Sequence, residues 1–570
     1  MDPGQTPTRT PKVIKRGGIH YTPQDLGGFL ANQALKLASK GRVRVLDPAC
    51  GDGSLLEAVA REAGGREVHL CGLDTDPDAV KGAIARLRRY TGGRVSFEVQ
   101  QADFVEEILA THQGVSRLFG PEHASGPVAN PFDVVIANPP YVRTQVLGSA
   151  VSRNLAADFG LSGRVDLYHA FVVGMALALR DGGVLSLLCS NRFMTTRSGS
   201  DLRRILASQF QIQHLYDLGD TKLFSAAVLP AIVLATRSTG KTQEFEMTSI
   251  YELKSAAGSC QPAASVVEAL KDGRTSPISV GGRSFGMRNG RVRVDTWDKP
   301  WVAPSEGGSE ILEGLAARTC MRFQDVARVR VGIKTTSDPV FIRRDWEALP
   351  VDVRPDDELL LPLLTHHIAG RWAAQRPTHR VLYPYDLESD RRKPLELENF
   401  QRTRAYLNAH QEILSSRKYV TDSGRFWWEI WVPQRPFWWR FPKIVFPDIS
   451  EEPKFWLDTS GAIVNGDCYW LPLRPNSDIG FLMLGVANSS LATLYYDETC
   501  GNRLYAGRRR YISQYVDNFP LPDPESPESL KVIRLVKTLI ECEPQVQRSD
   551  LESEVDYLVW RAFGLEQPAR

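Results

Sequence analysis

Short apolar runs alternate with longer amphipathic stretches along the N-terminal part of the chain. The apolar runs predict strands at residues 42–46, 68–73, 95–100, 132–137, 184–189, 212–218 and 228–236. The stretches between them carry apolar residues at helical spacing and predict helices, among them 24–38, 55–63, 166–179 and 201–209. Strands that alternate with helices are typical of an α/β fold with a largely parallel sheet. We therefore expect a seven-stranded α/β domain that ends near Arg237.

Polar side chains follow four of these strands, namely Asp47, Asp74, Asp103 and Asn138. Open α/β sheets bind ligands at the carboxyl ends of their strands, so these residues predict a binding site. Asp74 is placed to accept hydrogen bonds from both hydroxyls of a ribose, and Asp103 with Phe104 could bind an adenine amino group and ring face. A single acid at such a place is more often a helix cap or a loop residue. Recurrence at consecutive strand ends favours the ligand site.

A glycine-rich turn at residues 47–54, Asp-Pro-Ala-Cys-Gly-Asp-Gly-Ser, joins the first strand to the next helix. Gly51 and Gly53 would let the backbone approach a ligand closely. The spacing matches neither the Gly-x-Gly-x-x-Gly dinucleotide pattern nor a P-loop. The turn therefore favours a ligand that is not held by its phosphates.

The stretch Asn138-Pro139-Pro140-Tyr141 ends the fourth strand. Asn138 offers a side-chain oxygen and Pro139 a backbone carbonyl, and two fixed acceptors suit a substrate with an NH2 group. Tyr141 offers a flat face for a planar base or amide, and Phe193 is expected to be a second exposed ring at the end of the fifth strand. The alternative is a proline-rich turn that closes a strand.

Composition limits the classes of protein that remain. At 570 residues the chain should form two or three domains, and no apolar run reaches the length that spans a bilayer. The eight cysteines are scattered, which predicts reduced thiols in a cytoplasm and no metal site. Net charge is only +2, so a nucleic-acid surface requires local segregation of charge. Residues 1–17 are expected to be a flexible basic arm, and we expect no secretory signal there because no apolar segment is present.

The second half of the chain has a different composition. Residues 238–319 mix Gly, Ser and Pro clusters and are expected to be a connection with some short strands. In residues 320–522 aromatic and basic side chains interleave, which suits contacts with a sugar–phosphate backbone and stacking. The alternative is that the tryptophans pack in a core. Residues 523–570 are expected to be helical.

The order of these motifs resembles the gamma-class adenine-N6 DNA methyltransferases of restriction–modification and phage-defence systems, which have a Rossmann-like class I fold dependent on S-adenosylmethionine. Tyr-Thr-Pro at 21–23, the 46–54 turn and Asn-Pro-Pro-Tyr carry this resemblance. Stretches at 331–336, 442–447, 485–490 and 511–522 resemble a TaqI-like C-terminal specificity domain. The resemblance assigns cofactor binding to Tyr21, Thr22, Asp47, Ala49, Cys50, Gly51, Gly53, Asp74, Asp103, Phe104, Asn138 and Phe171, and catalysis to Asn138, Pro139, Pro140, Tyr141 and Phe193.

The implied activity is methyl transfer from S-adenosylmethionine to N6 of an adenine flipped out of double-stranded DNA, within residues 18–237. The specificity domain would recognise the DNA, and a cognate restriction endonuclease or other defence subunits would be partners. Cytosine-N4 methylation or RNA adenine methylation would use a similar pocket. Enzymes that methylate a glutamine amide share the tetrapeptide but are shorter. A DNA-recognition subunit of a defence complex is the alternative from another class.

Overall fold

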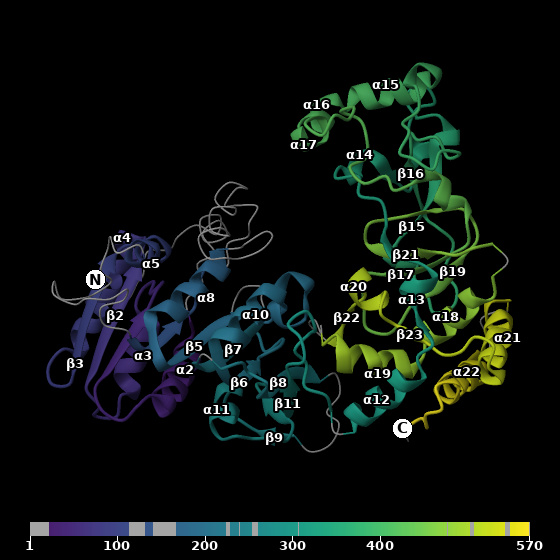
Figure 1. Ribbon diagram of the computed structural model, residues 1–570. Helices are drawn as coiled ribbons and strands as arrows, with labels where there is room; N and C mark the ends of the chain where they lie inside the picture. The colour runs from purple at the N-terminus through teal and green to yellow at the C-terminus, as the bar shows by residue number, and fades with distance from the viewer. Residues whose placement is uncertain are drawn as a thin grey trace. The chain divides into compact units, whose positions relative to one another are not determined.

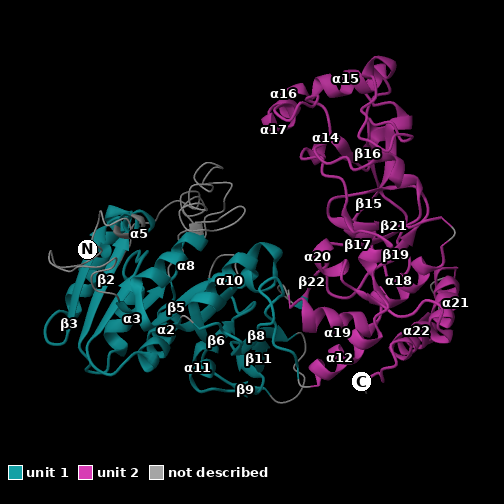
Figure 2. Ribbon diagram, in the orientation of Figure 1, with its two compact units in different colours: residues 1–305, 504–507 teal, residues 306–503, 508–570 magenta. Residues whose placement is uncertain are grey.

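The chain folds into two compact units, residues 1–305 with 504–507 and residues 306–503 with 508–570 (Figure 2). The computed structural model describes residues 22–112, 132–140, 167–223, 229–238, 240–253, 260–305, 307–475, 477–501, 507–541 and 548–568. Each unit has its own hydrophobic cores.

The first unit is built on one sheet with the strand order β3-β2-β1-β4-β5-β7-β6-β8-β11-β10-β9 (Figure 1). Strands β1 to β5 run parallel, and β7 is antiparallel to both β5 and β6. The expected Rossmann-like α/β fold is thereby confirmed, with β1 to β7 as the seven expected strands and β8 to β11 as an extension of the same sheet. The strands are β1 Val43–Asp47, β2 Val68–Asp74, β3 Val95–Gln101, β4 Phe132–Ala137, β5 Leu179–Ser190, β6 Phe210–Asp217, β7 Pro230–Arg237, β8 Glu244–Leu253, β9 Gln261–Pro262, β10 Ile278–Val280 and β11 Arg283–Arg293.

Helices cover both faces of this sheet, because alternate residues of its central strands enter two different cores. Val134 and Ile136 of β4 belong to one core, whereas Val135 and Ala137 belong to the other. The helices are α2 Gln24–Leu37, α3 Ser54–Glu62, α4 Pro77–Leu87, α5 Phe104–His112, α8 Leu167–Ala178, α9 Arg192–Thr195, α10 Ser200–Gln209 and α11 Val266–Lys271, with the 3-10 turns η1 Arg88–Tyr90 and η2 Arg197–Gly199.

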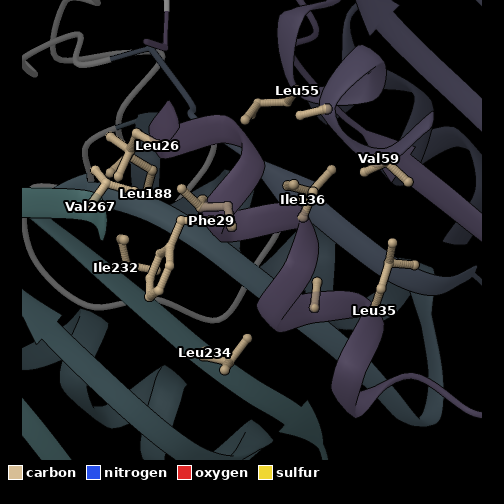
Figure 3. Packing of buried hydrophobic residues seen from close by; sticks show 14 of the residues in the cluster. Leu26, Phe29, Leu35, Leu55, Val59, Ile136, Leu188, Ile232, Leu234 and Val267 are labelled. Atoms are coloured by element: carbon tan, nitrogen blue, oxygen red, sulfur yellow. The ribbon is translucent and has the colours of Figure 1, made fainter. Parts of the chain in front are cut away.

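Helix α2 closes one of these cores. Its side chains Leu26, Phe29 and Leu35 lie with Leu55 and Val59 of α3 and with residues of β4, β5 and β7 (Figure 3). Phe29 and Leu30 are fully buried. Because α2 is anchored in this way, the residues just before it are held close to the sheet.

The sheet continues beyond the boundary that the sequence predicts at Arg237. Strand β8 pairs in parallel with β6, and β11 pairs with β8 along its whole length. Residues 238–319, expected to be a connection with some short strands, contribute the long strands β8 and β11 as well as the short strands β9 and β10 to the first unit. Strand β8 alternates exposed and buried side chains at its start. Its exposed positions are polar, so this segment lacks the continuous apolar run by which the earlier strands are predicted.

The second unit contains two four-stranded sheets, β13-β21-β17-β19 and β14-β16-β15-β20, and two small pairs, β12-β23 and β18-β22. Its strands are β12 Met321–Arg322, β13 Arg330–Val331, β14 Ile342–Arg343, β15 Leu360–Leu364, β16 His379–Leu382, β17 Lys443–Pro447, β18 Ile449–Ser450, β19 Trp456–Asp458, β20 Ile463–Val464, β21 Cys468–Pro472, β22 Arg509–Arg510 and β23 Pro520–Leu521.

Helices of the second unit include the C-terminal pair, α21 and α22, which packs on α18 and α19 in one core. The helices are α12 Gly308–Arg318, α13 Phe323–Val326, α14 Asp338–Phe341, α15 Gln401–Ala409, α16 Gln411–Ser415, α17 Lys418–Thr421, α18 Ile479–Ala487, α19 Ser490–Thr499, α20 Ser513–Val516, α21 Pro527–Glu541 and α22 Arg548–Ala562, and the 3-10 turns are η3 Trp346–Ala348, η4 Asp357–Leu359, η5 His366–Ile368, η6 Leu397–Asn399 and η7 Pro436–Arg440.

Aromatic residues of the second unit divide between core and surface. Those buried in its cores include Trp372, Tyr383, Tyr385, Trp428, Trp439 and Tyr511. Phe426 is 59% exposed, and Trp438 is partly exposed. Arg509 and Arg510 bind Asp497 and Asp448, so that basic run is structural. Among the described residues no single helix has the length and apolarity to cross a membrane; only the bent pair α18 and α19 passes that test together.

Candidate active site

The switch point of the sheet lies between β1 and β4, because the chain leaves β1 toward β2 and β3 and returns to the other side with β4 and β5. Such switch points open a crevice at the carboxyl ends of the strands. Asp47 ends β1 and Asn138 directly follows β4, so the two predicted site residues flank this point.

Asn138 is held by the segment that enters α2. Its amide nitrogen donates a hydrogen bond to the Thr22 hydroxyl at 3.2 Å, and Thr22 is 8% exposed. This bond holds the amide group of Asn138 against the entry to α2, and the side-chain oxygen is its hydrogen-bond acceptor. Pro139 is buried and Pro140 is partly exposed. Tyr21 and Tyr141, also predicted for the site, lie outside the described residues.

The glycine-rich turn needs its glycines. Gly51 has φ +54° and Gly53, which caps α3, has φ +79°, both in the left-handed region. A Cβ added at Gly53 would lie 3.0 Å from the Cα of Ala83 in α4. From the same helix Arg86 binds the backbone carbonyl and the carboxylate of Asp52. Helix α4 therefore holds the turn in place.

Asp74 connects the end of β2 to the turn. Its Oδ2 accepts a hydrogen bond from the backbone nitrogen of Gly51 at 2.8 Å, and its Oδ1 accepts one from Asp76 at 2.9 Å. Asp74 thereby ties the end of β2 to the glycine-rich turn.

Asp47 is a buried carboxyl group beside the turn. It is 1% exposed, and burial raises the pKa of Asp47 to about 8. Its Oδ1 accepts a bond from the Ala49 nitrogen at 3.2 Å, whereas Oδ2 is buried without a hydrogen-bond partner among the described residues. A buried oxygen without a partner suits a cationic ligand group. Cys50 is also buried, and burial raises the pKa of its thiol.

Asp103 caps α5, since its Oδ1 accepts bonds from the backbone nitrogens of Val105 and Glu106. No hydrogen bond to its Oδ2 occurs within the described chain. Phe104 is only 1% exposed, and its ring lies 5.4 Å from that of Phe171. Phe104 therefore packs against α8. The sequence predicts instead that its ring contacts the face of a bound adenine.

Phe193 is buried, contrary to the exposed ring that the sequence predicts. It is 6% exposed and meets Trp301 edge to face, with the ring centroids 5.9 Å apart. The backbone nitrogen of Trp301 also donates to the carbonyl of Met194. The cover comes from a segment more than a hundred residues later, so the local pattern around Phe193 could not reveal it.

Arg203 of α10 holds this covering segment in place, a role that sequence reasoning missed. The residue is fully buried. Its guanidinium donates to the carbonyls of Phe193 and Thr196 on one side and of Trp297 and Asp298 on the other. In the sequence Arg203 stands beside Arg204 on an amphipathic helix, where arginines are usually solvated.

A second network joins the ends of β5, β6 and β8. Asn191 donates to Asp217 at 2.9 Å, and the hydroxyl of Tyr251 donates to the other oxygen of Asp217 at 2.6 Å. Burial raises the pKa of Asp217, although these two bonds oppose the rise. Asn191 stands two residues before Phe193, so the network fixes the end of β5, from which the short helix α9 with Phe193 follows.

No group of three or more His, Cys, Asp or Glu residues that could bind a metal ion occurs in the described part of the chain. The site brings together hydrogen-bond acceptors at strand ends, a glycine turn with positive φ values and buried aromatic rings. Such a site can orient a polar ligand and hold the protons of an amine.

Comparison with known proteins gives matches over both units. Residues 69–224 match the family Eco57I restriction-modification methylase, and residues 396–521 match the TaqI-like C-terminal specificity domain. Type II methyltransferase M.BanIII of Aneurinibacillus aneurinilyticus is 36% identical, across 97% of this chain and 98% of that protein. Type II methyltransferase M.BstVI of Geobacillus stearothermophilus is 25% identical across 88% of each. A solved DrdV–DNA complex has a TM-score of 0.49 at 13% identity, covering 93% of this chain and 58% of that one.

Proposed function

Because the chain belongs to the type II DNA methyltransferases of restriction–modification systems, we propose that it methylates N6 of an adenine in duplex DNA with S-adenosylmethionine as the donor. The observation that carries the proposal is the Asn138 amide, held by Thr22 at the switch point of the sheet. A hydrogen-bond acceptor at this strand end, where such folds bind their ligands, supports the proposal.

Asn138 and Pro139 act on the amine of the substrate. The lone pair of an adenine amine is delocalised into the ring, so the amine becomes a nucleophile only when acceptors hold its protons and favour a pyramidal nitrogen. The Asn138 side-chain oxygen and the Pro139 carbonyl are those acceptors. The bond to Thr22 restricts the movement of the Asn138 side chain and so helps to position its amide group for the substrate amine.

The residues around the turn fit S-adenosylmethionine. The partnerless, buried Oδ2 of Asp47 suits the ammonium of the methionine part, Asp74 can accept from the ribose, and Asp103 Oδ2 can accept from the adenine amine. The positive φ values at positions 51 and 53 favour glycine, and the absence of side chains there lets the cofactor approach the backbone of the turn. When bound, the cofactor supplies a sulfonium methyl group that is itself the electrophile.

The transfer is direct in this proposal. Cytosine-C5 methylation requires an attacking thiolate. Cys50, the cysteine of the turn, has a pKa raised by burial and therefore holds its proton at neutral pH. Asn138 needs no covalent intermediate.

The adenine must leave the base stack to reach Asn138. We assign the stacking of the extruded base to Tyr141, because Phe193 is only 6% exposed and packs against Trp301. The methylated DNA would be protected from a cognate restriction endonuclease in the cytoplasm.

Modification-sensitive sequencing of DNA from cells that express the chain or its Asn138→Ala variant tests the proposal. We expect N6-methyladenine at one short sequence, present with the parent chain and absent with the variant, while the purified variant still binds S-adenosylmethionine. If the modified base is N4-methylcytosine, the substrate is cytosine and not adenine. Unmodified DNA together with methylated RNA would refute the proposal.

A further inference from the structure

Trp438 of the second unit lies beside two arginines. The guanidinium carbon of Arg330 is 4.4 Å from the centroid of the indole ring, and that of Arg435 is 5.9 Å from it. Arg330 begins β13, and Arg435 directly precedes η7, which carries Trp438. Residues more than a hundred positions apart thus bring two positive charges to one aromatic ring.

Neither arginine has an ion pair or a side-chain hydrogen bond within the described residues, and the Nε atom of Arg330 is buried without a partner. Burial lowers the pKa of Arg330, and the charge of Arg435 lowers it further. The two cations are therefore close enough to repel each other.

Arg440, at the other end of the same 3-10 turn, shows the ordinary arrangement. Its two terminal nitrogens donate to the two oxygens of Glu388 at 2.8 and 2.7 Å. It also lies over the ring of Phe437. Arg440 shows that an arginine stacked on an aromatic ring can also pair with a carboxylate. The stacking on Trp438 therefore does not explain why Arg330 and Arg435 have no carboxylate partner among the described residues.

The backbone fixes the positions of these two arginines. Lys334 and Val432 exchange two backbone hydrogen bonds of 3.0 Å, and the Val331 carbonyl accepts a bond of 2.7 Å from the Gln434 side chain. Gln434 has φ +66°, which is unfavourable for a residue with a side chain. The segments that carry Arg330 and Arg435 are thus tied together, and the strain at Gln434 is maintained next to Arg435.

We propose that Arg330 and Arg435, placed around Trp438, bind a phosphodiester group of the DNA backbone. Two fixed guanidinium groups without a carboxylate suit an anion with several acceptor oxygens. A DNA base cannot stack on the Trp438 face that the Arg330 guanidinium already occupies. The contact would hold the duplex irrespective of sequence, since phosphates carry no base information. The inference rests on the proposed function, which supplies DNA as the ligand.

The test measures binding of the full chain to a fluorescent duplex at a series of salt concentrations, with Arg435→Gln, Arg330→Gln and the control Arg440→Gln. Each phosphate contact contributes about 0.9 to the slope of log K against log salt. Because both arginines bind the same phosphate, we expect the slope to fall for Arg435→Gln and for Arg330→Gln, in each case by no more than about 0.9 and equally on cognate and scrambled duplexes. Arg440→Gln removes the same charge and should keep the parent slope.

Arg435 is exposed, so Arg435→Gln should leave the thermal unfolding temperature unchanged. If Arg330→Gln is unstable, the salt dependence of Arg435→Gln alone tests the inference. Arg435→Lys, which keeps the charge, should retain most of the slope. Parent slopes in both glutamine variants would overturn the inference while the proposed function stands. A parent chain that binds no duplex would overturn both.

Discussion

Thr22 and Asn138, 116 positions apart in the chain, are joined by a hydrogen bond from the Asn138 amide to the Thr22 hydroxyl. The resemblance to known methyltransferases assigns Thr22 to the cofactor. The structure shows that it also orients the residue to which we assign the chemistry. The entry to α2 is thereby part of the site.

Thr22→Val should lower the rate of methyl transfer about 10-fold, because one hydrogen bond of about 1–1.5 kcal/mol no longer holds the Asn138 amide. Thr22→Ser keeps the hydroxyl and should retain most of the rate. Single-turnover kinetics with saturating cofactor measure this effect. A loss confined to cofactor affinity would assign Thr22 to the cofactor alone.

Gly53→Ala should destabilise the protein more than Gly65→Ala. Both glycines have similar positive φ values, +79° and +83°, so both substitutions cost about 1 kcal/mol of backbone strain. Only at Gly53 would the new Cβ press on the backbone of Ala83; nothing lies within 4 Å of it at Gly65. Chemical denaturation gives the two free energies of unfolding. Gly53→Ala should also weaken cofactor binding, and equal stability of the two variants would disprove the packing argument.

Arg203→Gln should reduce the free energy of unfolding by at least about 3 kcal/mol, because it leaves several buried carbonyls without their charged donor. Arg204→Gln is the matched control on the same helix. Arg204 has only a 3.6 Å ion pair with Asp201, so its loss should cost less than about 0.5 kcal/mol. A comparable effect of both substitutions would show that Arg203 does not fasten the cover of Phe193.

The stability of the cofactor-free protein should fall as the pH rises from about 5 to about 8, through the titration of Asp47. Its pKa is about 8 in the folded chain and about 4 when unfolded, so within this window only the folded state holds the proton. Asp47→Asn does not titrate. Denaturation across this range should show the stability of the parent chain falling relative to the variant. A difference independent of pH would mean that Asp47 is ionised in the folded chain.

The strands and helices of the first unit could be predicted because their patterns are local. Strand β4 was expected at residues 132–137 and is found there, and β2 differs from its expected range by one residue. The extension of the sheet was missed because β8 and β11 become strands by pairing with distant partners. In the same way, Phe104 and Phe193 look like available rings in the sequence, while α8 and Trp301 cover them.

The sequence by itself determined the alternation of strands and helices, the polar strand ends and the family to which these motifs point. Each of these properties depends on residues close together in the chain. The tertiary structure alone decided that Thr22 meets Asn138, that Arg203 holds two distant segments and that Arg330 and Arg435 share Trp438. The reason is physical: burial and charge pairing depend on which segments pack together, and no local pattern records a partner a hundred residues away.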